Sequence, residues 1–161
     1  MINKRKIILA CALNGLMFGG IKWVYELSPM PMTLLLYCTF LGFTVTSCVG
    51  AKAEKAGIYL CNFAIGFLWA MGYMGAEYIL LLLPLSIIMA KTAAFGIVSF
   101  LIEITNILFP NKNEIWFAPL QFAVIIGIFS QQGNHIPYVV LALVIGMLAA
   151  LLSKKIYQNI L

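Results

Sequence analysis

The stretch Val139–Leu152, with the sequence VVLALVIGMLAALL, contains no charged or hydrogen-bonding side chain. A bilayer-spanning helix needs roughly 20 mostly apolar residues, and the flanking residues extend this stretch to such a length over 138–156. A strand of a membrane barrel would instead alternate apolar and polar residues. Because backbone groups in lipid must pair with one another, the stretch predicts a membrane-spanning helix.

The composition of the whole chain agrees with a protein embedded in lipid. Of its 161 residues, 63% are hydrophobic and only 9% are charged, whereas a soluble globular domain carries about 25% charged residues. Such a chain cannot cover its surface with polar groups, so lipid must be part of its solvent. We therefore predict an all-α integral membrane protein whose single transmembrane domain covers residues 1–161.

Prolines and short polar stretches divide the chain into six apolar segments. Proline cannot continue the interior of a helix, and Pro29, Pro31, Pro84 and Pro110 each fall between two such segments. The six predicted transmembrane helices cover residues 7–25, 32–50, 58–76, 85–108, 115–130 and 138–156. The stretch Glu77–Leu83 lies between two spans, and it is predicted either to extend the third span or to lie at the membrane interface.

The basic residues orient the predicted spans, because cytoplasmic loops of membrane proteins carry an excess of Lys and Arg. With the N-terminus inside, the cytoplasmic segments hold eight basic residues: Lys4, Arg5, Lys6, Lys52, Lys55, Lys112, Lys154 and Lys155. The outer loops then hold none. Both termini are therefore predicted to be cytoplasmic. The net charge of +5 reflects this asymmetry and does not indicate nucleic-acid binding.

A weak internal repeat appears at an offset of 80 residues. The third and sixth spans share a Gly, a Leu and an Ala in register, with Gly66 matching Gly146, and the first and fourth spans share two Ile and an Ala. Two halves of three spans each would have opposite orientations in the membrane, as in many transporters. The pattern leaves two interpretations open: a 3+3 inverted repeat, and chance matching of apolar helices.

No catalytic or metal-binding arrangement is visible in the sequence. It contains no Asp, a single His, and neither a phosphate-binding glycine loop nor a paired-histidine motif. The cysteines Cys11, Cys38, Cys48 and Cys61 lie within or beside apolar segments and lack metal-ligand spacing. We therefore expect neither an enzyme nor a protein with a metal or cofactor.

Charged residues inside the predicted spans are functional candidates, because a charge in the bilayer core costs at least about 2.5 kcal/mol. Lys22 and Glu26 are four residues apart, so they can pair on one face of the first span. Lys91 and Glu103 lie roughly 18 Å apart along the fourth span. Each of these two therefore needs another partner or water.

Polar residues from several spans fall into two groups at matched depth. The group nearer the cytoplasm contains Asn14, Ser47, Asn62, Glu103 and Gln121, and the group nearer the outside contains Lys22, Lys91, Gln131, Gln132, Asn134 and His135. They predict either a hydrated solute pathway or hydrogen bonds between helices with no solute. Gln and Asn amides both donate and accept hydrogen bonds, which suits an uncharged or zwitterionic solute. The two lysines would attract a carboxylate.

Small residues recur every four positions on two spans: Cys11, Gly15 and Gly19 on the first, and Ala142, Gly146 and Ala150 on the sixth. Such stripes let helix backbones approach each other closely. Packing within the chain is the simpler interpretation, and docking of another subunit is the alternative.

Two motifs connect the chain with a known family. The first reads Phe-Ala-Pro-Leu-Gln-Phe from Phe117 and continues through Phe129 to Gln132-Gly133-Asn134, and the second is the Gly-x-x-Trp-Ala-Met run Gly66–Met71. Both resemble the YcdZ-like family of bacterial inner-membrane proteins, a domain-of-unknown-function family. The resemblance covers nearly all the spans and implies a small multi-span protein of the bacterial inner membrane, without implying a substrate. Lys91, Glu103 and the turn Asn111–Glu114 depart from the family pattern, which carries less charge there.

The chain is predicted to consist almost entirely of transmembrane helices, with polar residues at membrane depth. These features predict a small-solute permease or channel that works as a homo-oligomer in the lipid bilayer. A substrate-binding membrane subunit of a larger transporter is the first alternative. A non-transporting membrane scaffold is the second.

Overall fold

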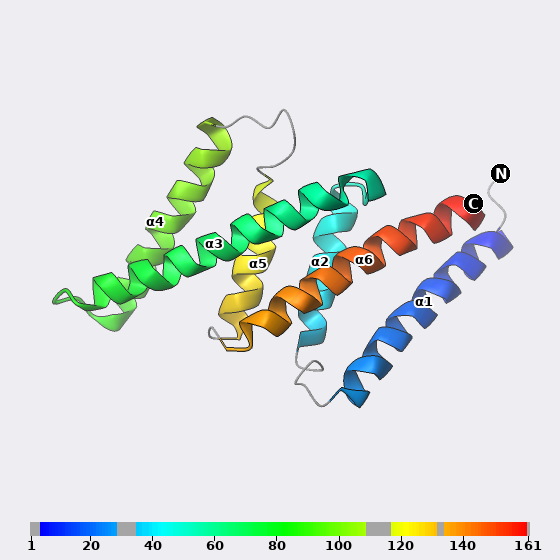
Figure 1. Cartoon of the computed structure of the whole chain (residues 1–161), viewed down its shortest axis with the longest axis horizontal. Coiled ribbons are helices and arrows are strands. Elements are labelled where there is room, and N and C mark those ends of the chain that lie inside the picture. The colour runs from blue at the N-terminus through cyan, green and yellow to red at the C-terminus, as the bar shows by residue number, and fades with distance from the viewer. Residues whose placement is uncertain (1–3, 29–34, 109–116, 132–133, 161) are drawn as a thin grey trace. The chain divides into compact units, whose positions relative to one another are not determined.

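The computed structural model describes residues 4–28, 35–108, 117–131 and 134–160. This part of the chain is all-helical, as predicted (Figure 1). Its elements are α1 (Lys4–Leu27), α2 (Leu36–Cys48), the 3-10 helix η2 (Ala53–Lys55), α3 (Ala56–Leu81), α4 (Ile87–Leu108), α5 (Ala118–Ser130) and α6 (Ile136–Ile160).

Four helices are long and apolar enough to cross a membrane, namely α1, α3, α4 and α6. The other two, α2 and α5, contain 13 residues each and are therefore about 20 Å long at 1.5 Å per residue. This is shorter than the roughly 30 Å hydrocarbon core of a bilayer. The long helices mark a membrane protein, and the predicted spans 32–50 and 115–130 extend beyond the helices that form there.

The stretch Glu77–Leu83, for which the sequence left two interpretations, belongs mainly to the third span. Helix α3 continues without a break to Leu81, and the turn that follows contains Pro84. In that turn the Leu82 and Leu83 amides donate to the carbonyls three residues earlier. The proline then prevents the helix from continuing, and α4 starts at Ile87.

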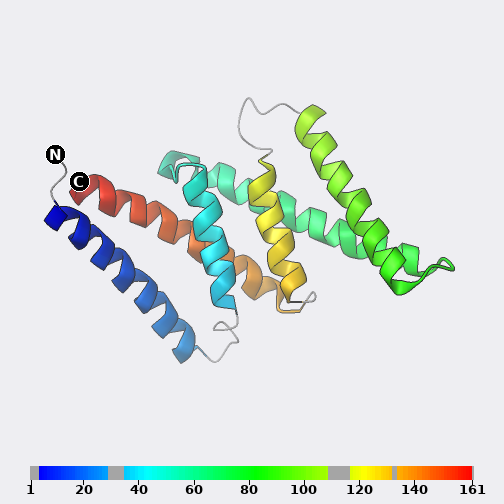
Figure 2. The ribbon, with the colours of Figure 1, turned by 180° about the vertical axis from the view of Figure 1, so that it is seen from behind.

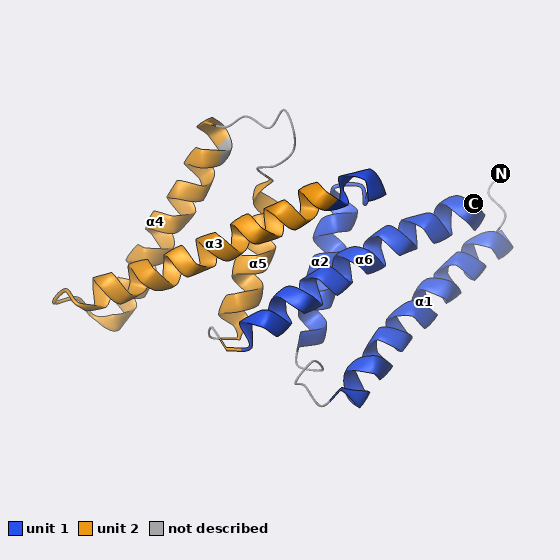
Figure 3. Cartoon of the chain, in the orientation of Figure 1, with its two compact units in different colours: residues 1–56, 135–161 blue, residues 57–134 orange. Residues whose placement is uncertain are grey.

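The chain divides into two compact units, which are coloured in Figure 3. Unit 1 consists of residues 1–56 and 135–161 and contains α1, α2 and α6. Unit 2 consists of residues 57–134 and contains α3, α4 and α5. Each unit therefore contains one short helix and two long ones.

In unit 1, α2 and α6 cross at two glycines, and the crossing is seen from both sides in Figures 1 and 2. A Cβ atom at Gly146 would overlap the Thr39 carbonyl, and one at Gly42 would overlap the Leu143 carbonyl. Ala150, one turn after Gly146, is 1% exposed. The close helix packing predicted for the stripe on the sixth span is present.

The stripe on the first span behaves differently. Gly15 and Gly19 are exposed, and a Cβ atom at either would meet no other described atom within 4 Å. The packing within the chain that was expected at these two glycines is therefore not found in unit 1. Of the three stripe residues, Cys11 contacts α6, through the Tyr157 hydroxyl, and the contact does not extend to the two glycines.

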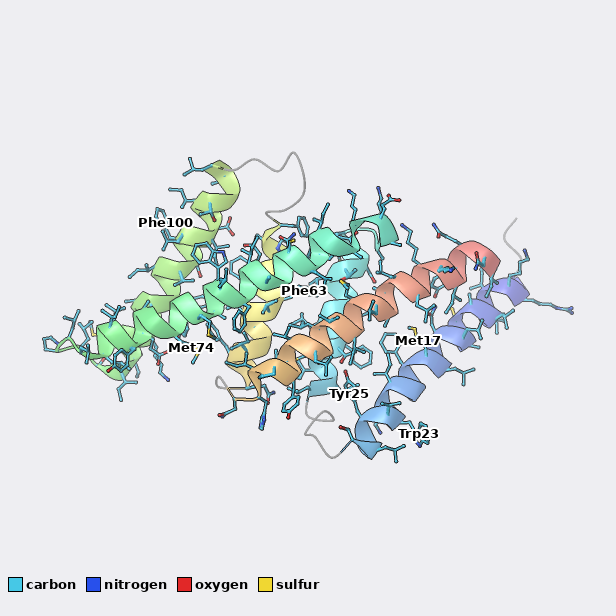
Figure 4. All side chains as sticks on the ribbon, viewed as in Figure 1. Met17, Trp23, Tyr25, Phe63, Met74 and Phe100 are labelled. Atoms are coloured by element: carbon cyan, nitrogen blue, oxygen red, sulfur yellow. The ribbon has the colours of Figure 1, made fainter. Side chains whose placement is uncertain are left out.

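Three polar contacts fix which helix ends of unit 1 lie together. The Lys154 ammonium donates to the Gly50 carbonyl at 2.5 Å, and the Cys11 sulfur lies 3.8 Å from the Tyr157 hydroxyl. At the opposite end, the Tyr25 and Thr39 hydroxyls are 2.8 Å apart in a buried contact, and Tyr25 is labelled in Figure 4. The start of α1 and the ends of α2 and α6 therefore share one end of unit 1.

In unit 2, α3 crosses α5 at Gly66. A Cβ atom there would lie 2.5 Å from the Gln121 carbonyl oxygen, so only glycine allows this approach. Further along the same two helices, the ring of Tyr73 lies against that of Phe129 at a tilted angle. Both contacts advance in the same direction along the chain, which makes α3 and α5 parallel.

Candidate solute-binding site

A pocket of about 690 Å³ lies among the three helices of unit 2. It is lined by Tyr73, Met74, Glu77, Tyr78 and Leu81 of α3, by Lys91 of α4 and by Phe129 of α5. Ligand-binding pockets commonly measure about 300–1,000 Å³ and combine apolar walls with a few polar groups. The size and the lining of this pocket both fit that description.

Local structure explains why α3 supplies most of the lining. Residues four apart on a helix lie on one face, and the α3 lining residues include Tyr73, Glu77 and Leu81 at that spacing. The turn at Pro84 then reverses the chain. Glu77 and Lys91 are each seven residues from this proline, so the hairpin places them opposite one another.

The charged part of the pocket is an ion pair between two helices. The Lys91 ammonium lies 3.6 Å from a Glu77 carboxylate oxygen, and the lysine side chain is 56% exposed while the glutamate is 21% exposed. An ion pair this accessible contributes at most about 1 kcal/mol to stability. Both charges therefore remain able to bind a ligand that carries the complementary groups.

Aromatic rings form the apolar wall beside the ion pair. The ring of Tyr73 lies 4.2 Å from that of Phe129 and 6.3 Å from that of Phe95, at tilted and edge-on angles. Aromatic rings favour such offset arrangements. Tyr73 and Glu77 are four residues apart on α3 and both line the pocket, so the aromatic wall adjoins the carboxylate.

A second polar group lies where α3 and α5 cross, and it joins two residues predicted from the sequence. The Asn62 side-chain oxygen accepts hydrogen bonds from the Phe117 amide at 2.7 Å and from the Gln121 side-chain amide at 3.3 Å. Phe117 is the N-cap of α5, so Asn62 caps this helix from α3. Asn62 and Gln121 are both fully buried. The Gln121 side-chain oxygen has no hydrogen-bond partner among the described residues.

The other predicted residues lie apart from these two groups. Lys22 pairs with Glu26 at 3.5 Å, as expected, and both are exposed on α1 in unit 1. Glu103 is exposed on α4, and no partner for it occurs in the described part of the chain. The Asn134 amide donates to the Gln131 carbonyl at 2.8 Å, while Gln132 lies outside the described residues.

Six of the seven pocket residues were not among the sequence candidates: Tyr73, Met74, Glu77, Tyr78, Leu81 and Phe129. The equal distance of Glu77 and Lys91 from Pro84 was the signal that could have identified the pair. No comparable signal marks the aromatic residues, because apolar spans contain many of them. Among the described residues, no three His, Cys, Asp or Glu side chains are grouped to hold a metal ion.

Comparison with known proteins does not connect this chain to a characterised family. The resemblance to the YcdZ-like family therefore stays a prediction that rests on the two sequence motifs. No protein-family model matches the chain, and no curated protein or solved structure matches it significantly.

Proposed function

We propose that this protein is a membrane transporter for small solutes and that unit 2 holds the solute. The observation that carries the proposal is the pocket in which Glu77 and Lys91 meet beside aromatic rings. Charged residues in apolar helices are costly and usually serve ion or substrate pathways. A bacterial inner membrane is the location that the family resemblance implies.

The chemistry of the pocket favours a zwitterionic solute. Glu77 and Lys91 carry opposite charges 3.6 Å apart, so their fields largely cancel for an ion of one sign. A molecule with both an ammonium and a carboxylate group can instead replace the pair with two complementary pairs. Its apolar part would contact Tyr73 and Phe129. Small amino acids have this combination of groups.

Helix lengths support the 3+3 inverted repeat as part of the proposal. Helices α1, α2 and α3 contain 24, 13 and 26 residues, and α4, α5 and α6 contain 22, 13 and 25. Each half thus has the order long, short, long. Short apolar segments at corresponding positions of two halves are typical of transporters whose binding site lies near those segments.

The two glycine crossings support the same repeat. Gly146 lies against Thr39 and Phe43, and Gly66 lies against Gln121. The offset of 80 residues that relates the two glycines maps Thr39 and Phe43 onto 119 and 123, which flank 121. The crossings are therefore equivalent, and each unit combines two helices of one half with the third helix of the other half.

The proposed topology has six crossings with both termini in the cytoplasm. It is supported by the shared end of unit 1, where the start of α1 lies with the ends of α2 and α6, and by the basic residues at that end. In intact cells, cysteines introduced at Ser28 and Asn134 should react with an impermeant thiol reagent. A cysteine introduced at Lys52 should not, and its labelling would contradict this topology.

Thermal stabilisation of the purified protein tests the binding site. A ligand that binds only the folded state raises the melting temperature. We expect small zwitterionic amino acids to raise it, and matched amines or carboxylates with only one of the two groups to raise it far less. Lys91→Met should abolish the shift, whereas Lys22→Met, which breaks the exposed pair of unit 1, should preserve it. Equal shifts in both variants would show that the pocket is not the site.

A second candidate function is favoured by one observation. Gly15 and Gly19 are exposed with open space around them, which suits the docking of another helix. The protein would then be a substrate-binding subunit that docks to a transport partner through α1. Copurification of such a partner with wild type, and its loss in Gly15→Leu, would favour this function over transport by the chain alone.

A further inference from the structure

A row of residues on one face of α3 continues from the pocket toward the other end of unit 2. At about 100° per residue, positions 62, 66, 69, 73 and 77 fall within about 80° of arc. Three of them contact α5, because Asn62 and Gly66 lie against Gln121 and Tyr73 lies against Phe129. In Figure 4, Phe63 and Met74 lie near the two ends of this part of α3.

Two polar atoms along this row are buried without a hydrogen-bond partner among the described residues. They are the indole nitrogen of Trp69, which can only donate, and the side-chain oxygen of Gln121, which can only accept. Buried polar groups in native proteins are nearly always hydrogen-bonded, and ordered water is a frequent partner. A donor and an acceptor left open on one interface indicate that water or a solute supplies the missing bonds.

The two open atoms lie along α3 in the direction that leads away from the pocket. Trp69 is one helical turn before Tyr73, which lines the pocket, and Gln121 lies opposite Gly66, one turn earlier again. From Glu77 to Asn62 the row extends about 22 Å along the helix. The hydrocarbon core of a bilayer is roughly 30 Å thick, so the row is long enough to cover most of that thickness. Within the row, between Trp69 and Asn62, the α3 and α5 backbones come into close contact at Gly66.

We propose that the pocket of unit 2 continues as a water-filled path along this face of α3, from Glu77 past Trp69 to Gln121. The crossing at Gly66 closes the path in this structure. Water and small hydrophilic solutes would form hydrogen bonds with the Trp69 indole and the Gln121 amide along it. That a solute uses the path rests on the proposed transport function, whereas access of water does not.

Cysteine accessibility tests the path without knowledge of the solute. Single cysteines at Tyr73, Trp69 and Leu68 are placed in a variant that lacks Cys11, Cys38, Cys48 and Cys61, and methanethiosulfonate ethylammonium is added to vesicles that contain the protein. The reagent attacks the thiolate, which forms in water and not in lipid. Leu68 is the control because it is 67% exposed on the opposite face of α3, where we expect lipid to cover it.

We expect Tyr73→Cys to react fastest, Trp69→Cys within about tenfold of it, and Leu68→Cys at least about a hundredfold more slowly, the differences that an aqueous path and a lipid-covered face imply. Trp69→Cys reacting as slowly as Leu68→Cys while Tyr73→Cys reacts would overturn the proposal. It would leave the pocket and the transport function standing. Conversely, a reactive Trp69→Cys in a protein that binds no zwitterion would support the path and reject the substrate class.

The native indole provides a second readout that leaves Trp69 in place. In a variant with Trp23→Phe and Trp116→Phe, Trp69 is the remaining tryptophan. A hydrated indole should emit at long wavelength and be quenched by aqueous acrylamide more than by brominated lipid. Short-wavelength emission that only the brominated lipid quenches would contradict the path.

Discussion

The two units have matching helix lengths but differ in how their interiors are filled. In unit 1, α2 and α6 approach each other through glycines on both helices, Gly42 and Gly146, and the ion pair Lys22–Glu26 lies on a single helix at the surface. In unit 2, α3 contributes the glycine of the crossing, Gly66, and the residue opposite it on α5 is Gln121, which carries an amide side chain. Its ion pair Lys91–Glu77 joins two helices and lines a pocket.

This difference agrees with the proposed function, in which the two units have different roles. Close packing of backbones leaves no room for a ligand, so unit 1 provides rigidity. Unit 2 has bulky aromatic and charged residues around a space of about 690 Å³, so it provides chemistry. Under the proposed inverted repeat, we expect function in the copy that departs from tight packing.

The largest predicted effect is on the packing of unit 1. Gly146→Ala places a methyl group against the Thr39 carbonyl, so we expect a loss of about 3 kcal/mol, at the upper end of typical overpacking costs. Gly15→Ala is the matched control, since open space surrounds that position and alanine favours a helix over glycine by about 0.5–1 kcal/mol. Thermal unfolding in detergent measures both. Equal melting temperatures for the two variants would contradict the tight packing of unit 1 on which the comparison depends.

An intermediate effect is expected at the buried amides of unit 2. Asn62→Leu removes the acceptor for the Phe117 amide and for the Gln121 side chain, and leaving such groups unsatisfied costs about 2 kcal/mol. Adding Gln121→Leu should recover part of this loss, because one unsatisfied donor disappears. Chemical unfolding of the single and double variants measures the coupling.

The matched control for this prediction lies in unit 1. The buried Thr46 hydroxyl has no partner among the described residues, so Thr46→Val should be neutral or stabilising. If Thr46→Val destabilises the protein as much as Asn62→Leu does, polar burial does not distinguish the units.

The smallest effect on stability is expected at the ion pair of the pocket. Lys91 is more than half exposed, so solvent screening limits the stabilisation from its pair with Glu77 to less than about 1 kcal/mol. Lys91→Met and Lys22→Met should therefore melt close to wild type when no solute is present. A large loss of stability in Lys91→Met alone would show that this pair holds unit 2 together and has a purely structural role.

The sequence predicts the long helices because uninterrupted apolar runs can satisfy their backbones in lipid only by forming helices. It does not predict where α2 and α5 begin. Prolines such as Pro31 show where a helix cannot continue, yet they do not determine where the next one starts. The observed start of α5 at Ala118 depends on a tertiary contact, the bond from the Phe117 amide to Asn62.

The candidate site was predictable only in part, for similar reasons. Asn62 and Gln121 were grouped from their depth alone, and they do meet. Gly15 and Gly146 have the same small-residue spacing, but spacing does not reveal which face another helix covers. The sequence indicates that Lys91 needs a partner, but it does not indicate whether the segment that contains Glu77 continues the third span. The hairpin that joins them became evident only once α3 was seen to continue to Leu81.

The most direct test of the central claim, that unit 2 carries the solute site, is uptake into vesicles. Wild type, Lys91→Met and Lys22→Met are reconstituted at equal protein density, and uptake of radiolabelled small amino acids is measured. We predict uptake by wild type and Lys22→Met at similar rates, and a loss of at least about tenfold in Lys91→Met, as expected when one of two charge contacts to a bound solute is removed. Uptake that is abolished in Lys22→Met and retained in Lys91→Met would contradict the account.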